Sequence, residues 1–161
     1  MSADTYVVPA DQITSMAGRK RTHFLNEHAR RTDKSLSSVT GLSEIDFCLI
    51  EVEPGDETTE HHKHYHEEEC LYVLSGEGTA RIGAESHEIS VGDFIGFRKA
   101  GLAHSLKNTG NDVLQCIVVS QRKSHDVSDY PRLGKRLFRN QDLTWNLVDL
   151  TVIDRPFGAK V

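Results

Sequence analysis

The sequence is poor in the features that mark secreted and membrane-spanning proteins. It has three cysteines, Cys48, Cys70 and Cys116, and their odd number and wide spacing favour reduced buried thiols over disulfides. No apolar run approaches the roughly 20 residues needed to cross a bilayer. Residues 1–12 lack the cationic start and apolar stretch of a secretory signal. We therefore expect a cytoplasmic protein that makes no contact with membranes.

An excess of positive charge is also missing. Lysine and arginine together number 19 against 24 aspartates and glutamates, which gives a net charge of −5. The basic residues gather only in short groups, at 19–21 and 30–31, which we interpret as solvated. A nucleic-acid-binding surface needs a larger basic patch, so we expect no nucleic-acid partner.

What the sequence does contain is a series of short apolar runs separated by glycine turns. A run of this kind, rich in β-branched and aromatic residues, is typical of a strand. No long amphipathic helix and no internal repeat is evident, so an all-β barrel or sandwich is expected. The run at 70–74 is predicted to close in a hairpin at 75–78. The clearest strands are predicted at 45–52, 70–74, 78–83, 93–97 and 113–120.

The two ends of the chain look less regular than its middle. A short strand is predicted within residues 7–12, and no apolar stripe is visible over 26–35. Residues 125–140 carry Pro131 and Gly134, so we expect a loop with at most one short strand there. With 161 residues the chain fits one domain.

A cluster of histidines and one glutamate is the most specific signal. His62, His64 and His66 alternate, so on an extended strand their side chains leave one face. Glu69 has the wrong parity to join them unless the chain turns or bulges at 66–68. His104 must come from a separate strand. Three imidazoles and a carboxylate suit a borderline divalent metal and leave coordination positions open.

The spacing of these residues resembles that of the cupin superfamily. The first cupin motif is matched by Gly55, His62, His64, Glu69 and Gly76, with one extra residue before the first histidine. The second motif is matched by Gly92, Gly101, His104 and Asn108, with one extra residue after its first glycine. Lys99 stands where that motif has a proline. The resemblance covers residues 45–120.

This resemblance implies a cupin jelly-roll barrel with a metal site. We expect a single cupin domain over 1–161, with a barrel core at about 45–121, an N-terminal arm at 1–44 and a C-terminal extension at 122–161. The implied ligands of a divalent ion (Zn, Mn, Fe or Ni) are His62, His64, Glu69 and His104. An alternative pair, His64 with His66, leaves too few residues before Glu69 for the cupin spacing.

Three further residues are candidates for work on a substrate. His66 shares parity with the proposed ligands, so it is a candidate catalytic base. Arg98 and Lys99 precede the second motif, and two cations at a cavity mouth would bind a carboxylate or phosphate. The alternative is that both lie in an exposed loop.

The resemblance leaves the reaction open. Among small single-domain cupins, the chain looks most like those grouped with sugar or sugar-phosphate isomerases. There a Lewis-acidic metal would polarise a carbonyl while a base moves a proton. An Fe(II)-dependent dioxygenase and a non-catalytic module for a small ligand or a metal are the alternatives, so whether the protein is an enzyme stays open. We expect a small-molecule ligand. The apolar residues at 145–150 need cover, so we also expect a homodimer.

Overall fold

A computed structural model of the chain describes residues 5–154 and 158, and β-strands dominate it. The strands are β1 Arg19–His23, β2 Asn26–Ser35, β3 Ile45–Val52, β4 Lys63–His64, β5 Glu69–Ser75, β6 Gly78–Ile82, β7 Glu85–Ile89, β8 Phe94–Phe97, β9 His104–Lys107, β10 Leu114–Gln121, β11 His125–Tyr130, β12 Lys135–Asn140 and β13 Asn146–Asp149. The helical segments are α1 Ala10–Ser15, α2 Leu36–Thr40 and the 3-10 turn η1 Leu150–Val152. The prediction of an all-β fold is confirmed.

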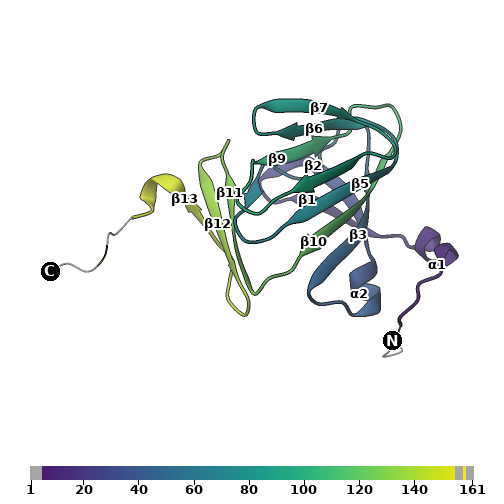
Figure 1. Ribbon diagram of the computed structural model, residues 1–161, viewed down its shortest axis with the longest axis horizontal. Coiled ribbons are helices and arrows are strands. Elements are labelled where there is room, and N and C mark those ends of the chain that lie inside the picture. The colour runs from purple at the N-terminus through teal and green to yellow at the C-terminus, as the bar shows by residue number, and fades with distance from the viewer. Residues whose placement is uncertain (1–4, 155–157, 159–161) are drawn as a thin grey trace.

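The strands form three sheets. A six-stranded sheet has the order β1-β2-β3-β10-β5-β8, and a three-stranded sheet β7-β6-β9 lies above it in Figure 1. The C-terminal strands form a separate sheet in the order β13-β12-β11-β4. Isolated bridges join Glu57 to Lys107 and His62 to His104, so the segment before β4 continues the sheet beyond β9. This arrangement is a jelly-roll barrel with additional strands from both ends of the chain.

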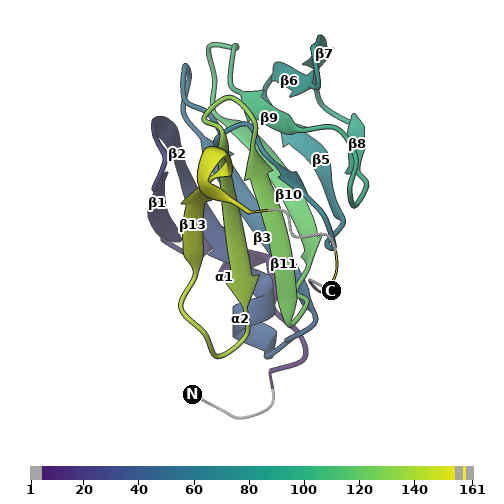
Figure 2. The same ribbon diagram turned by 90° about the vertical axis from the view of Figure 1, so that its left-hand side faces the viewer.

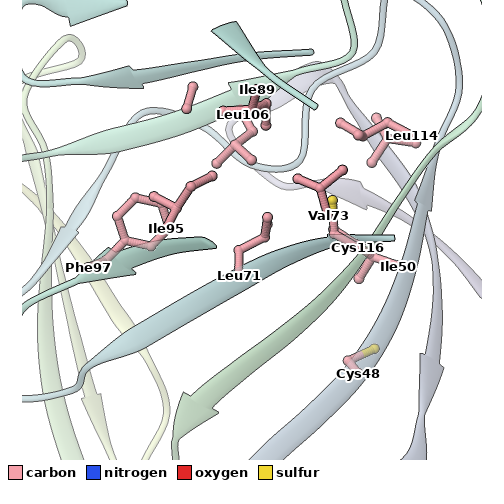
Figure 3. Close-up of a cluster of buried hydrophobic side chains, with 12 residues drawn as sticks. Cys48, Ile50, Leu71, Val73, Ile89, Ile95, Phe97, Leu106, Leu114 and Cys116 are labelled. Atoms are coloured by element: carbon pink, nitrogen blue, oxygen red, sulfur yellow. The ribbon is translucent and has the colours of Figure 1, made fainter. Parts of the chain in front are cut away.

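The core lies between the six-stranded and three-stranded sheets. Along β3 and β5 every second side chain is buried, because alternate residues of a strand point to opposite faces. Fully burying one aliphatic side chain stabilises the fold by about 1.5–3 kcal/mol. Figure 3 shows the cluster, with side chains from seven strands: Cys48, Ile50, Val52, Leu71, Val73, Ala80, Ile89, Ile95, Phe97, Leu106, Leu114 and Cys116.

The turn after β5 differs from the sequence prediction. β5 pairs with β10 and β8, whereas β6 pairs with β7 and β9, so the predicted hairpin at 75–78 is a crossing between sheets. Gly76 makes the crossing possible: it has φ of +80°, and a Cβ there would lie 2.7 Å from the Val113 carbonyl oxygen. A side chain at this position would force the two strands apart.

The N-terminal arm adds regular structure to the barrel. The strand predicted within 7–12 is wrong, because α1 begins at Ala10 after Pro9, whose fixed backbone suits a helix start. The stretch 26–35 forms the long strand β2, which pairs with β1 on one side and with β3 on the other. Only Ala29 and Lys34 of β2 are buried, which explains why an apolar stripe is missing.

The C-terminal extension also departs from expectation. Residues 125–140 form a regular hairpin, β11 and β12, with its turn at Pro131–Gly134, so the predicted loop is wrong. Figure 2 looks onto these strands, with β1 and β2 beside them. β11 pairs on its other edge with β4, which brings the extension against the histidine-bearing segment.

Three further features concern the cysteines, the helices and the loop after β9. All three cysteines are free thiols, and Cys48 and Cys116 are buried. No helix in the described ranges combines the length and the apolar character that crossing a bilayer demands. Buried Asn108 donates to the carbonyl oxygens of Val52 and Asp112, both at 2.8 Å, and so fixes the loop after β9.

Candidate metal centre

Three strands position the histidines and the glutamate. His62 and His104 lie opposite each other, and their backbones exchange two hydrogen bonds of 3.0 and 2.7 Å. His64 lies on β4 opposite Ser128 of β11. Glu69 is the first residue of β5, between Ser120 of β10 and Phe97 of β8. The predicted set therefore comes from strands of three different sheets that the barrel brings together.

The four side chains converge. The Nε2 atoms of His62 and His64 are 3.0 Å apart, and the ring centroids of His62 and His104 are 4.7 Å apart. Ligating atoms of His62, Glu69 and His104 all lie within 4.8 Å of one another. The structure thus brings together all four residues that the motif spacing selects.

Hydrogen bonds on the far side of each ring fix which nitrogen faces the cluster. The Nδ1 atom of His62 is 2.8 Å from the carbonyl oxygen of Glu60, which can only accept, so Nδ1 carries the proton. The Nδ1 atom of His64 is 2.5 Å from a carboxylate oxygen of Asp126. The Nε2 atoms of both rings are therefore directed at each other, away from these partners. Support of this kind orients a histidine for metal binding.

The ionisation of the cluster follows from burial and from neighbouring charges. Burial lowers the pKa of His62 far below its usual value and that of His104 to about 4, so both rings are neutral at pH 7. Burial of the carboxylate raises the pKa of Glu69, although His64 opposes this. Burial is the largest single influence and lowers the pKa of His64, but the hydrogen bond to Asp126 and the negative charges of nearby carboxylates together outweigh it, so the net shift is upward.

These donors fit a divalent metal ion. The Nε2 atom of His104 is buried and has no hydrogen-bond partner in the described chain, and such an orphaned atom costs free energy unless it binds something. Two ring nitrogens 3.0 Å apart need a proton or a metal ion between them, and a divalent cation can take the place of the proton. Neutral imidazoles beside a carboxylate are the donor set that Zn, Mn, Fe or Ni accepts.

A second group of possible ligands lies behind His64. His64, Glu67 and Asp126 also have ligating atoms within 4.8 Å of one another. Glu67 already contacts the guanidinium of Arg139 and accepts a hydrogen bond of 2.6 Å from the backbone of Lys123. We interpret this group as support for His64, because its carboxylates are taken up by cations and N–H donors.

A cavity of about 340 Å³ opens onto the histidines. It lies between the β1–β2 hairpin and the β11–β12 hairpin, beside each other in Figure 2. Glu69 faces a smaller cavity of about 120 Å³ that His64 also lines. The larger cavity is lined by Arg21, Thr22, His23, Phe24, Ala29, Arg31, Thr58, Thr59, His62, His64, Ser128, Tyr130, Leu137, Arg139 and Trp145.

The residues predicted to act on substrate lie apart from this lining. The ring of His66 packs against His125 at 4.7 Å. Arg98 and Lys99 are exposed in the turn after β8, which the Ala100 amide ties to the His64 carbonyl at 2.7 Å. Their roles stay predictions. Sequence reasoning missed Asp126 and the arginines of the cavity, because no motif links distant polar strands to a histidine cluster.

The chain forms a jelly-roll barrel in which histidines and a glutamate converge. This combination is typical of β-barrel proteins that have a metal site. Residues 48–120 match the Cupin domain family, and the chain belongs to the cupins. The predicted family and fold are thus confirmed.

Three known proteins are similar to this chain over most of its length. The chain is 44% identical to a candidate sugar phosphate isomerase of Acidithiobacillus ferrooxidans, over 94% of this chain and 97% of that one, with a TM-score of 0.91. A cupin sugar phosphate isomerase of Silicibacter pomeroyi is 19% identical with a TM-score of 0.77, covering 89% of this chain and 94% of that one, and shares the fold. An oxalate-binding protein of Thermotoga maritima is 29% identical over 116 residues, 70% of this chain and 86% of the relative.

Proposed function

We propose that the protein is a divalent-metal-dependent enzyme that isomerises a small sugar phosphate. The observation that carries the proposal is the convergence of three imidazoles and Glu69 beside a cavity of about 340 Å³. The 44% identity to a candidate sugar phosphate isomerase over nearly the whole chain supports this choice of reaction.

His62, His64, Glu69 and His104 would hold the metal, which we expect to be Zn, Mn, Fe or Ni. When bound, such an ion supplies a Lewis acid that polarises a carbonyl and its neighbouring hydroxyl. The chain itself orients the donors: the Glu60 carbonyl fixes the ring of His62, and Asp126 fixes that of His64.

Two side chains of the cavity hold protons where a substrate would lie. Burial raises the pKa of Tyr130 to about 12, so its hydroxyl stays protonated. Burial lowers the pKa of His23 to about 4, and its Nδ1 accepts a 3.1 Å hydrogen bond from the Leu25 amide. Its proton is therefore on Nε2, and both groups serve as hydrogen-bond donors. His66, the base that the sequence predicts, lies outside this lining, so its role needs a separate test.

The test is isomerisation by the metal-loaded protein. Aldose and ketose phosphates are incubated in D2O and followed by NMR, because isomerisation through a base exchanges the transferred hydrogen with solvent. His104→Ala should lose both metal and turnover, whereas His87→Ala, on exposed β7, should keep both. His66→Gln should keep the metal, and a loss of turnover in this variant would identify His66 as the base. If the protein shows no turnover with Zn, Mn, Fe and Ni each tested in turn, the proposal is contradicted.

A second function has one observation in its favour. The Thermotoga maritima relative is an oxalate-binding protein, which suggests a module that binds a small acid without turning it over. Calorimetry with oxalate separates the two: tight oxalate binding together with no isomerisation would favour the binding module.

A further inference from the structure

Two arginines face each other at one wall of the cavity. Arg21 on β1 and Arg31 on β2 are direct cross-strand partners, and both line the cavity. Like charges in such a pair destabilise a hairpin. Placing the two arginines side by side therefore destabilises the hairpin, and a bound anion would offset this electrostatic repulsion.

A single carboxylate holds both arginines in place. Nε of Arg21 lies 2.8 Å from one carboxylate oxygen of Asp33, and Nε of Arg31 lies 2.8 Å from the other; the Asp33 side chain is only 10% exposed. Arg31 also donates to the Thr58 carbonyl oxygen at 3.0 Å. Two guanidinium groups against one carboxylate leave one positive charge uncompensated. Each guanidinium carries five N–H donors, so both keep terminal N–H groups beyond these contacts.

The rest of the cavity suits the carbon skeleton of a small polar metabolite. Its floor includes His62 and His64, and its walls include the aromatic rings of Phe24, Tyr130 and Trp145. A volume of about 340 Å³ is at the lower end of the range for small-molecule sites. Arg21, Arg31 and the two histidines line the same cavity, so one ligand could contact both groups.

We propose that Arg21 and Arg31 form a phosphate-binding subsite, so that the ligand of this cavity is a small phosphorylated metabolite. Planar guanidinium forks bind phosphate oxygens in pairs, which gives both affinity and orientation. The inference rests on the proposed function and deepens it by naming the residues that select the substrate class. It places the anion on strands that precede the cupin motifs, away from Arg98 and Lys99.

The test is calorimetric titration of the metal-loaded full chain with inorganic phosphate. Arg21→Gln and Arg31→Gln should each weaken phosphate binding about tenfold or more, because each removes a charge-assisted hydrogen bond. Arg19→Gln is the matched control, since Arg19 lies on the same strand with the same parity and outside the cavity lining. The double variant Arg98→Ala, Lys99→Ala tests the rival prediction, that the exposed turn after β8 binds the anion.

Two further measurements keep the outcome interpretable. Chelated protein should retain arginine-dependent phosphate binding, which excludes phosphate held by the metal alone. Arg21 has a side chain 53% exposed on an edge strand, so Arg21→Gln should fold even if Arg31→Gln does not. Melting temperatures check this.

Equal phosphate affinities in Arg21→Gln and Arg19→Gln would overturn the inference. So would arginine variants that weaken oxalate binding but not phosphate binding, or a loss of phosphate affinity only in the Arg98 and Lys99 double variant. Arginine-dependent phosphate binding without isomerisation would leave the subsite standing and remove the proposed function. If the protein isomerises its substrate but neither arginine variant changes phosphate binding, the proposed function stands and only the subsite is wrong.

Discussion

At the scale of single residues, His64 depends on a partner far along the chain. Asp126 lies 62 residues away and holds Nδ1 of His64 at 2.5 Å, while Ser128 contacts the same nitrogen at 3.1 Å. Asp126 is buried, and the hydrogen bond and charge of His64 overcome the effect of burial to lower its pKa to about 2. The carboxylate is therefore ionised throughout the working range of the protein.

Asp126→Asn should weaken metal binding about 10–100-fold, the usual effect of losing a partner behind a ligating histidine. An amide can present its NH2 group to Nδ1 and so favour the wrong tautomer of His64. Metal affinity is measured by competition with a chromophoric chelator. Asp129→Asn is the control, because Asp129 lies on the same strand but binds Arg136 and Tyr65 instead. Equal affinities in the two variants would exclude this role for Asp126.

Metal affinity should fall as the pH drops from 7 to 5, because protons compete with the metal for the ligand atoms. We expect at most two such protons. A group with a raised pKa holds a proton that the metal must displace, and this applies to His64 and Glu69. The pKa of His104 is about 4 and that of His62 is well below its usual value, so both rings are neutral over this range and contribute no proton. The slope of log affinity against pH measures the proton number. A slope near three would mean that the buried histidines also titrate.

At the scale of strands, predictability follows the kind of side chain that each strand buries. β3 and β10 were predictable because their alternating apolar residues pack into the core. β2 and β11 were not, because they bury ionic or polar groups such as Lys34, Asp126 and Asp129 against partners that folding supplies. The spacing of the two cupin motifs selected the four converging residues, although the strands that carry them belong to different sheets. It could not select the arginines, which only tertiary structure brings to the cavity.

Removing the metal should lower the melting temperature, because the proposed ligands join the His62–His64 segment to β5 and β9. A ligand that binds only the folded state raises the free energy of unfolding by about 4 kcal/mol when its concentration is a thousand times Kd. Melting curves before chelation, after chelation and after metal is added back measure the effect. His87→Ala should respond like the wild type. A curve that does not move after verified metal loss would show that the barrel does not depend on the ion.

At the scale of the whole molecule, the C-terminal sheet leaves apolar side chains uncovered. Trp145 and Leu147, before and on the edge strand β13, are 56% and 38% exposed. An edge strand with exposed apolar residues is suited to pairing with another copy.

We expect a homodimer held in part by this edge, because pairing would cover both side chains. Light scattering should give twice the chain mass of 18.0 kDa. Leu147→Asp should shift the protein toward monomer, whereas Leu133→Asp, in the turn after β11, should not. A monomeric wild type at micromolar concentration would contradict the expectation.

The separation between His64 and Asp126 also has a kinetic consequence. While the chain is being synthesised, the histidine segment leaves the ribosome well before β11, which must pair with β4 to bring Asp126 against the ring. Contacts between distant segments form late, since closing a long loop costs entropy before any contact repays it. We therefore expect the metal to be acquired after the C-terminal hairpin has docked, so that it locks a finished barrel and does not nucleate one.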